Sequence, residues 1–97
     1  MAYSLVDGIN ITVAGDSANG DITIRLFDVV APLHVSRIIQ LTRDGVYDSV
    51  AFHRVIDGFM AQTGDVQYGN ISGDLNYAGA GGSDYPNLEA EFSNIAF

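Results

Sequence analysis

The stretch from residue 66 to residue 97 limits the fold most, because its apolar side chains follow neither a helical nor a strand period. It is rich in Asn, Ser and Asp and is interrupted by five glycines: Gly69, Gly73, Gly79, Gly81 and Gly82. Loops of this length are uncommon in compact domains and are usually functional or incomplete. We expect a long loop here, closing with a single helical turn at 88–92, and regular elements only before it.

A β-hairpin is predicted near the start of the chain. Residues 10–14 form a short run of strand-favouring side chains, and residues 21–27 alternate apolar and polar side chains, as a strand with one buried face does. Residues 16–20, DSANG, lie between the two runs and are typical of a turn, and Asn19-Gly20 is the strongest two-residue signal among them, because both positions tolerate a positive φ. We therefore expect the runs to pair antiparallel around this turn.

One helix and a second pair of strands follow. Proline suits a first helical turn, and Pro32 opens an amphipathic run that is predicted to be helical over 32–43. The apolar runs 50–55 and 59–63 are predicted strands, with an Asp-Gly pair between them as a tight turn. The predicted class is mainly β with one helix: about four strands, one helix and a long loop.

Charge and composition exclude several classes of function. The chain has 4 Lys and Arg residues against 12 Asp and Glu, a net charge of −8, and such a surface repels phosphate backbones and anionic lipid. We therefore expect neither a nucleic-acid nor a membrane partner. The absence of cysteine excludes disulfides and thiol catalysis. Residues 1–10 lack the basic and apolar segments of a signal peptide, so we expect a cytoplasmic location.

No metal or cofactor site is predicted. The two histidines are far apart in sequence, and we expect His34 to be exposed on the helix and His53 to be hydrogen-bonded within a strand. One alternative stays open, because residues 79–84 are similar to a single imperfect copy of the glycine–aspartate repeats that bind calcium. Such repeats bind the ion by stacking, so surface solubility is the simpler explanation of the many aspartates.

Residues 52–65, FHRVIDGFMAQTGD, carry the most distinctive pattern. Strand alternation places Phe52, Arg54 and Ile56 on one side of the first of these strands. An arginine among apolar neighbours is costly to desolvate, so it normally has a partner or a task. From the residues alone two interpretations of Arg54 stay open: a buried pair with a carboxylate, or a functional group.

This segment resembles the signature of the cyclophilins, a family of peptidyl-prolyl cis-trans isomerases that bind cyclosporin. Flanking segments are similar to the family in the same order and spacing: 20–27, 31–32, 45–48 and 91–94. The resemblance covers residues 9–97, and so long a signature with ordered flanks is highly specific. Arg37 departs from it, since many members have asparagine there; we interpret this as variation between lineages.

The resemblance implies a β-barrel fold, of which this chain would form only a part. Cyclophilins form a closed eight-stranded β-barrel capped by two helices, and this chain is similar to the first four strands and the first helix of the bacterial type. We therefore expect one incomplete cyclophilin-type domain over 1–97, with the hairpin, helix and signature strands at 9–65 and the long loop at 66–97. The C-terminal half is expected to be absent, which would leave an open sheet edge and an uncovered apolar face.

The resemblance also implies a mechanism that needs no metal or cofactor. Arg54 would be the main catalytic residue, its guanidinium interacting with the prolyl amide. Phe59 and Met60 would form part of a pocket for the proline ring, and Gln62 would hydrogen-bond the substrate backbone. A twisted amide nitrogen regains its lone pair, so the contact with Arg54 would strengthen in the transition state.

The implied partners are proline-containing peptides and unfolded proteins, with cyclosporin-type ligands as further candidates. Phe52 and His53 are expected to be structural, Phe52 in the core and His53 through a fixed hydrogen bond. The fragment itself is expected to have little activity. Two alternatives stay open: a non-catalytic module that binds proline peptides, and a structural fragment that needs a complementing chain.

Overall fold

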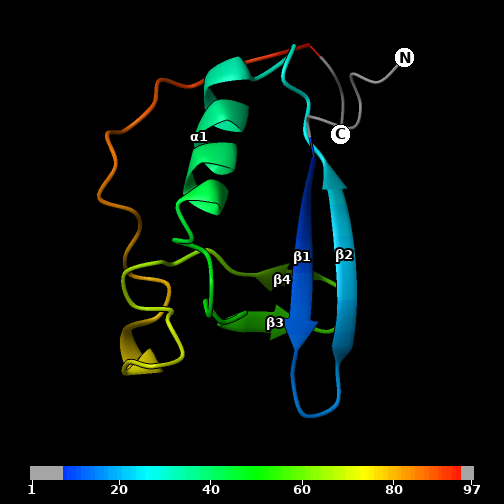
Figure 1. Cartoon of the computed structure of the whole chain (residues 1–97), viewed down its shortest axis with the longest axis vertical. Helices are drawn as coiled ribbons and strands as arrows, with labels where there is room; N and C mark the ends of the chain where they lie inside the picture. Colours follow the sequence, from blue (N-terminus) through cyan, green and yellow to red (C-terminus); the bar gives the residue numbers. More distant parts are fainter. Residues whose placement is uncertain (1–7, 95–97) are drawn as a thin grey trace. The chain divides into compact units, whose positions relative to one another are not determined.

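The computed structural model describes residues 8–94 and divides into two compact units. The first unit combines the chain up to Gln40 with the segment from Leu88 onward, and the second is Leu41–Asn87. The elements, shown in Figure 1, are β1 (Gly8–Ala14), β2 (Asn19–Arg25), α1 (Pro32–Arg43), β3 (Arg54–Ile56), β4 (Met60–Gln62) and the 3-10 helix η2 (Leu75–Tyr77). The expectation about a signal peptide concerns residues that lie mostly outside the described range.

β1 and β2 form the predicted antiparallel hairpin, and its loop overlaps the predicted turn region 16–20 but excludes Asn19-Gly20. Ala14 pairs with Asn19, so the loop is 15–18, and the two residues expected to form the turn begin β2 instead. The Asn19 side-chain oxygen closes the loop by accepting the Gly15 N–H at 3.1 Å. Asparagine readily makes such local bonds to the backbone, and this one moves the turn toward the N-terminus.

The two faces of this hairpin differ in chemistry. Polar pairs cross one face: the Thr12 hydroxyl donates to Asp21 Oδ1 at 2.8 Å, and the Thr23 hydroxyl donates to Asn10 Oδ1 at 3.2 Å. The opposite face is apolar and consists of Ile9, Ile11, Val13, Ile22 and Ile24. None of these apolar side chains is fully buried, so the described residues leave this face partly uncovered.

Helix α1 has the predicted bounds, and its end follows from backbone hydrogen bonds. The Val46 N–H donates to the Leu41 carbonyl at 3.0 Å, and the Gly45 N–H donates to the Thr42 carbonyl at 3.2 Å. This pair of bonds is the Schellman motif, which satisfies the last helical carbonyls. Within residues 8–94, no helix is long and apolar enough to cross a membrane.

The start of α1 depends on a residue that is distant in sequence. Ala31 offers no side-chain acceptor, and the first turn holds no acidic residue. The Glu91 carboxylate accepts the N–H groups of Leu33 at 3.1 Å and His34 at 2.8 Å, and it lies 2.5 Å from His34 Nδ1. Glu91 therefore serves as the N-terminal cap of α1.

Segment 88–94, drawn from orange to red in Figure 1, passes the start of α1 in an extended form. The helical turn expected at 88–92 is therefore wrong. Its backbone is extended because Glu91 reaches across to the helix instead of closing a local turn. The one short helix after residue 66 is η2, within the described residues, where Asp74 caps the start by accepting the Asn76 N–H at 3.0 Å.

The second unit contains a small antiparallel sheet, β3 and β4. Both strands are shorter than the predicted runs 50–55 and 59–63, because residues 49–51 bond to the following loop rather than to β4. The described strands form two separate two-stranded sheets, and no barrel is closed. The mainly β class with one helix is confirmed, while the barrel remains a property of the family fold.

Few side chains are buried among the described residues. Only Val35 and Leu41 are buried apolar side chains, at 7% and 5% exposure, and none is completely inaccessible. Phe27 and Phe92 are exposed at 66% and 94%. Because the apolar face is expected to be uncovered, we expect six core side chains to lose packing partners: Ile22, Ile24, Leu26, Val35, Ile38 and Phe52. Five of the six are exposed or half-buried, and the expectation is wrong for Val35.

We expect the isolated 97-residue chain to unfold without a sharp thermal transition and to associate at micromolar concentration. Burying one large apolar side chain is worth about 1.5–3 kcal/mol, while a whole domain is stable by only about 5–15 kcal/mol. Several incomplete burials are enough to remove that margin. Circular dichroism during heating and sedimentation velocity measure both properties, and a cooperative transition of a monomer would contradict the prediction.

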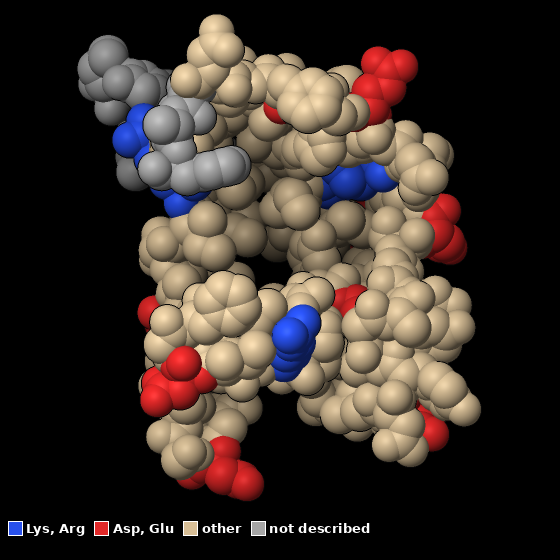
Figure 2. All heavy atoms as spheres, turned by 180° about the vertical axis from the view of Figure 1, so that it is seen from behind, with Lys and Arg blue, Asp and Glu red and all other residues tan. Residues whose placement is uncertain are grey.

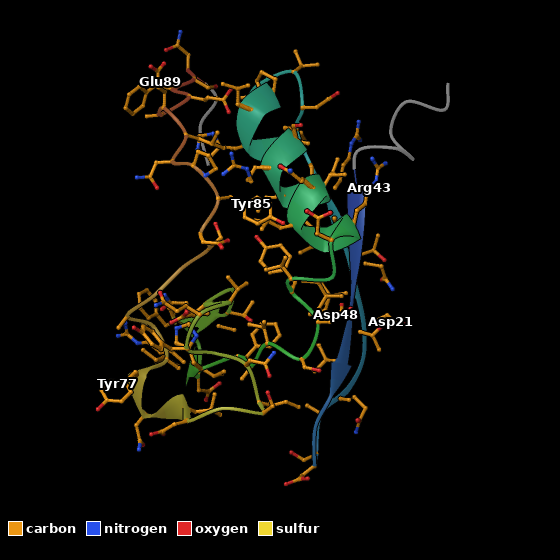
Figure 3. All side chains as sticks on the ribbon, turned by 60° about the vertical axis from the view of Figure 1, so that its left-hand side comes forward. Asp21, Arg43, Asp48, Tyr77, Tyr85 and Glu89 are labelled. Atoms are coloured by element: carbon orange, nitrogen blue, oxygen red, sulfur yellow. The ribbon has the colours of Figure 1, made fainter. Side chains whose placement is uncertain are left out.

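We also expect Glu91→Ala to loosen the first turn of α1. Loss of the carboxylate leaves the N–H groups of Leu33 and His34 without their acceptor, so both amides should exchange faster with solvent. Glu89→Ala is the matched control, because Glu89 lies two residues away, is exposed and makes no hydrogen bond or ion pair with the described residues of α1 (Figure 3). Equal exchange rates in the two variants, measured by hydrogen exchange, would show that Glu91 does not cap the helix.

Candidate functional site

The β3–β4 hairpin brings the predicted catalytic arginine and the predicted glutamine together. Arg54 pairs directly with Gln62, and Ile56 pairs with Met60. Directly paired residues of antiparallel strands point to the same side, with Cβ atoms about 4.5–5.5 Å apart. Arg54, Met60 and Gln62 therefore share one face of the hairpin, as the proposed site requires.

Phe59 belongs to the turn rather than to the second strand, where the pattern placed it. The turn is 57–59: the Phe59 N–H donates to the Ile56 carbonyl at 3.0 Å, and β4 begins at Met60. Gly58 has a φ of 72°, a conformation that favours glycine. The Phe59 ring is 77% exposed and Met60 is half-buried, so an aromatic side chain stands free at the tip of the hairpin.

The Arg54 side chain is exposed and makes no hydrogen bond or ion pair with any residue of the described part of the chain. The alternative of a buried Arg–carboxylate pair is therefore wrong. The pattern misled because the apolar neighbours of Arg54 are themselves exposed, Val55 at 67% and Ile56 at 38%. The guanidinium keeps its five N–H donors available for a ligand.

Phe52 and His53 precede β3 instead of lying within it. Phe52 is half-buried rather than part of a closed core. His53 Nδ1 is buried and has no hydrogen-bond partner among the described residues, so this nitrogen does not make the fixed hydrogen bond expected of His53. The ring instead lies against the backbone of Gly79, where a Cβ atom would come within 3.3 Å of His53 Nε2.

Asp65 organises the long loop, and the sequence analysis did not single it out. Its side chain is only 4% exposed. Oδ1 accepts the N–H groups of Gln67 at 3.0 Å and Tyr68 at 2.9 Å, and Oδ2 accepts those of Gly79 at 2.7 Å and Gly81 at 3.0 Å. The signal in the sequence is an aspartate three residues after the end of β4, followed by glycines whose N–H groups no side chain of their own can cover.

These hydrogen bonds change the acidity of Asp65. The Tyr68 N–H is the largest influence and lowers the pKa of the Asp65 carboxyl; desolvation opposes it, and the bonds from Gly81, Gly79 and Gln67 lower it further. The net direction is downward, because all four donors favour the ionised form. The carboxylate is therefore held charged at neutral pH.

Tyrosine side chains make two further contacts in the loop. The rings of Tyr68 and Tyr77 lie 6.1 Å apart at an angle of 53°. The Tyr85 hydroxyl donates to Asp44 Oδ2 at 2.5 Å, and Figure 3 shows the Tyr85 ring beside the end of α1. The loop without a repeating pattern is thus anchored along its length by side chains.

The calcium alternative for residues 79–84 has no support in this geometry. Calcium needs several oxygen ligands, whereas Gly79 and Gly81 direct N–H donors at the Asp65 carboxylate. Among residues 8–94, no group of three or more His, Asp and Glu side chains is placed to hold a metal. On the face drawn in Figure 2, acidic side chains are dispersed rather than gathered in one patch.

Comparison with known families assigns the chain to one of them. The sequence model of the family described as "Cyclophilin type peptidyl-prolyl cis-trans isomerase/CLD" matches residues 9–96. The chain therefore belongs to the cyclophilin-type peptidyl-prolyl cis-trans isomerase family.

Curated relatives support the same assignment. The chain is 53% identical over 81 residues to a "Probable peptidyl-prolyl cis-trans isomerase" of Brucella suis, a match that covers 81% of this chain and 41% of that protein. It is 38% identical over 87 residues to a Staphylococcus haemolyticus protein whose name gives the same activity, covering 90% of this chain and 40% of that protein. The chain thus spans about two fifths of the length of these relatives. No solved structure matches it.

We expect the loop to open in acid. A carboxyl whose pKa is lower in the folded than in the unfolded state stabilises the fold above its unfolded pKa, near 3.9, and loses that contribution as pH falls through the folded pKa. The protection of the Gly79 and Gly81 amides, relative to the intrinsic exchange rate at each pH, should therefore fall below about pH 4. NMR amide-exchange measurements between pH 7 and pH 2 test this, and pH-independent protection of both amides would contradict it.

Proposed function

We propose that the protein containing this chain is a peptidyl-prolyl cis-trans isomerase that speeds rotation about X–Pro bonds during protein folding. The observation that carries the proposal is the register of one hairpin, which puts Arg54, Met60 and Gln62 on one face beside the exposed Phe59. Family membership and the names of the relatives agree with this activity.

The reaction needs positioning rather than bond chemistry. Rotation about an X–Pro bond breaks amide resonance and takes about 10–100 s without a catalyst at 25 °C. In our proposal Phe59 and Met60 hold the proline ring, and the Gln62 amide binds the neighbouring substrate backbone. These contacts determine which peptide bond rotates. No step of the proposed mechanism requires a metal or a nucleophile.

Arg54 would stabilise the twisted amide. As the C–N bond rotates, the nitrogen regains its lone pair and becomes a better acceptor for a guanidinium N–H. A hydrogen bond to a charged group is worth about 1.5–3 kcal/mol, and each tenfold acceleration needs about 1.36 kcal/mol. One such bond supplies about one to two orders of magnitude, so the shaped proline pocket must supply the rest.

The substrates we propose are proline-containing segments of peptides and unfolded proteins, which can reach an exposed hairpin. Cyclosporin-type ligands are proposed for the same surface, since the family is named for binding them. A module that binds proline peptides without isomerising them would use the same residues. An NMR exchange assay on an X–Pro peptide separates the two functions, because only an isomerase broadens or exchanges the cis and trans signals.

In the full-length protein, Arg54→Ala should lower kcat/KM at least about tenfold and leave the fold intact, because the lost contact is made in the transition state and Arg54 has no partner among the described residues. Arg43→Ala is the matched control, an exposed arginine in the last turn of α1 (Figure 3). A protease-coupled assay on an X–Pro peptide measures both variants. Unchanged turnover of Arg54→Ala would refute the catalytic role.

A further inference from the structure

We propose that Asp65 is a positioning residue for Arg54: its buried carboxylate fixes the long loop against the residues that lead into β3. The inference rests on the proposed function, because it assigns to Asp65 a part in the same site. Asp65 lies outside the face of the hairpin that carries Arg54 and Gln62, so it acts through the backbone and not by touching substrate.

The first step is the closure of the loop by one carboxylate. Two of its four hydrogen bonds are local, to residues 67 and 68, and two reach Gly79 and Gly81, 14 and 16 residues further on. Both ends of the segment 67–81 are therefore bound to the same side chain. Charged acceptors bind N–H groups about twice as strongly as neutral ones, so an ionised Asp65 is central to this closure.

The second step joins the closed loop to His53. Gly79 has a φ of 101° and leaves room for the imidazole, since a Cβ there would come within 3.3 Å of Nε2 and 3.4 Å of Cδ2. His53 is the residue directly before Arg54. Because Nδ1 of the ring is buried without a partner, packing against Gly79, rather than a hydrogen bond from Nδ1, limits how the ring can move.

The third step is a set of hydrogen bonds to residues 49–51, just before His53. The Ala51 N–H donates to the Gly69 carbonyl at 2.8 Å, and the Ile71 N–H donates to the Ser49 carbonyl at 2.9 Å. The Thr63 hydroxyl donates to the Ala51 carbonyl at 2.8 Å, which ties the residue after β4 to the segment before β3. Residues 49–53 are therefore held by the loop that Asp65 closes.

The Arg54 side chain has no hydrogen bond or ion pair to any other described residue, so the position of its guanidinium depends on the backbone that carries it. β3 is only three residues long, and Arg54 is its first residue. Movement of 49–53 would therefore pass directly to the Cα of Arg54. A misplacement of about 1 Å can cost an enzyme about a hundredfold in rate, so a bracing loop has catalytic consequences.

The test compares Asp65→Asn with Asp74→Asn in the full-length protein. Asparagine keeps the size of the side chain but removes the charge and one of the two acceptor oxygens. Asp74 is the matched control, because it lies in the same loop and accepts a single local N–H at the start of η2. Three quantities are measured: kcat and KM on an X–Pro peptide, amide exchange at Gly79 and Gly81, and the NMR order of the Arg54 Nε–H group.

We expect Asp65→Asn to lower kcat about tenfold with KM nearly unchanged, to speed exchange at Gly79 and Gly81, and to reduce the order of Arg54 Nε–H. Asp74→Asn should change none of the three. A merely structural role for Asp65 would lower thermal stability without altering kcat or the Arg54 signal at a temperature where the variant is folded, and that result would overturn the proposal.

Two further outcomes keep the test decisive. If the wild-type protein does not isomerise the peptide, the proposed function fails, while the order of Arg54 Nε–H still shows whether Asp65 positions that residue. If Asp65→Asn does not fold, Gly79→Ala replaces it, because the added methyl group presses on His53 and leaves the carboxylate in place. Gly79→Ala should then lower kcat and Arg54 order together, and retention of both would refute the role.

Discussion

One buried carboxylate holds together the loop 67–81, whose only regular element is the short 3-10 helix η2. A segment with so little regular structure must still find partners for its backbone N–H groups, since a buried unpaired group costs free energy. Asp65 satisfies four of them, two nearby and two from the far end of the loop. The glycines that remove every repeating pattern from the sequence are the residues that make this closure feasible, because they let the backbone approach the carboxylate.

A carboxylate that accepts backbone N–H groups also joins distant parts of the first unit. Glu91 accepts two N–H groups at the start of α1 and lies beside His34, so it links segment 88–94 to the helix as Asp65 links the two ends of the loop. Partial burial raises the pKa of Glu91, but its hydrogen bonds and the adjacent His34 lower it overall. The chain has a net charge of −8, and Asp65 and Glu91 are two of its acidic residues that each accept several backbone N–H groups.

Features that depend on residues close together in the sequence could be predicted, whereas features that depend on distant contacts could not. The bounds of α1, the antiparallel pairing of β1 with β2 and of β3 with β4, and the family were all predicted, because each depends on neighbouring residues or on a contiguous signature. The first hairpin turn was misplaced by the side chain of Asn19, and the helical turn at 88–92 was lost to a bond 57 residues away. The pairing that unites Arg54 with Gln62 was predicted; the loop that braces it was not.

The site and the stability of the fold therefore rest on different parts of the molecule. Hydrogen bonds within residues 49–81 place the hairpin that carries Arg54, and they need little apolar burial. The apolar face of β1 and β2 is only partly covered among the described residues, in a chain that spans about two fifths of the length of its relatives. In the proposed mechanism, the placement of Arg54 is a local property of the hairpin, whereas the rest of the catalytic effect would depend on a shaped pocket around the proline ring.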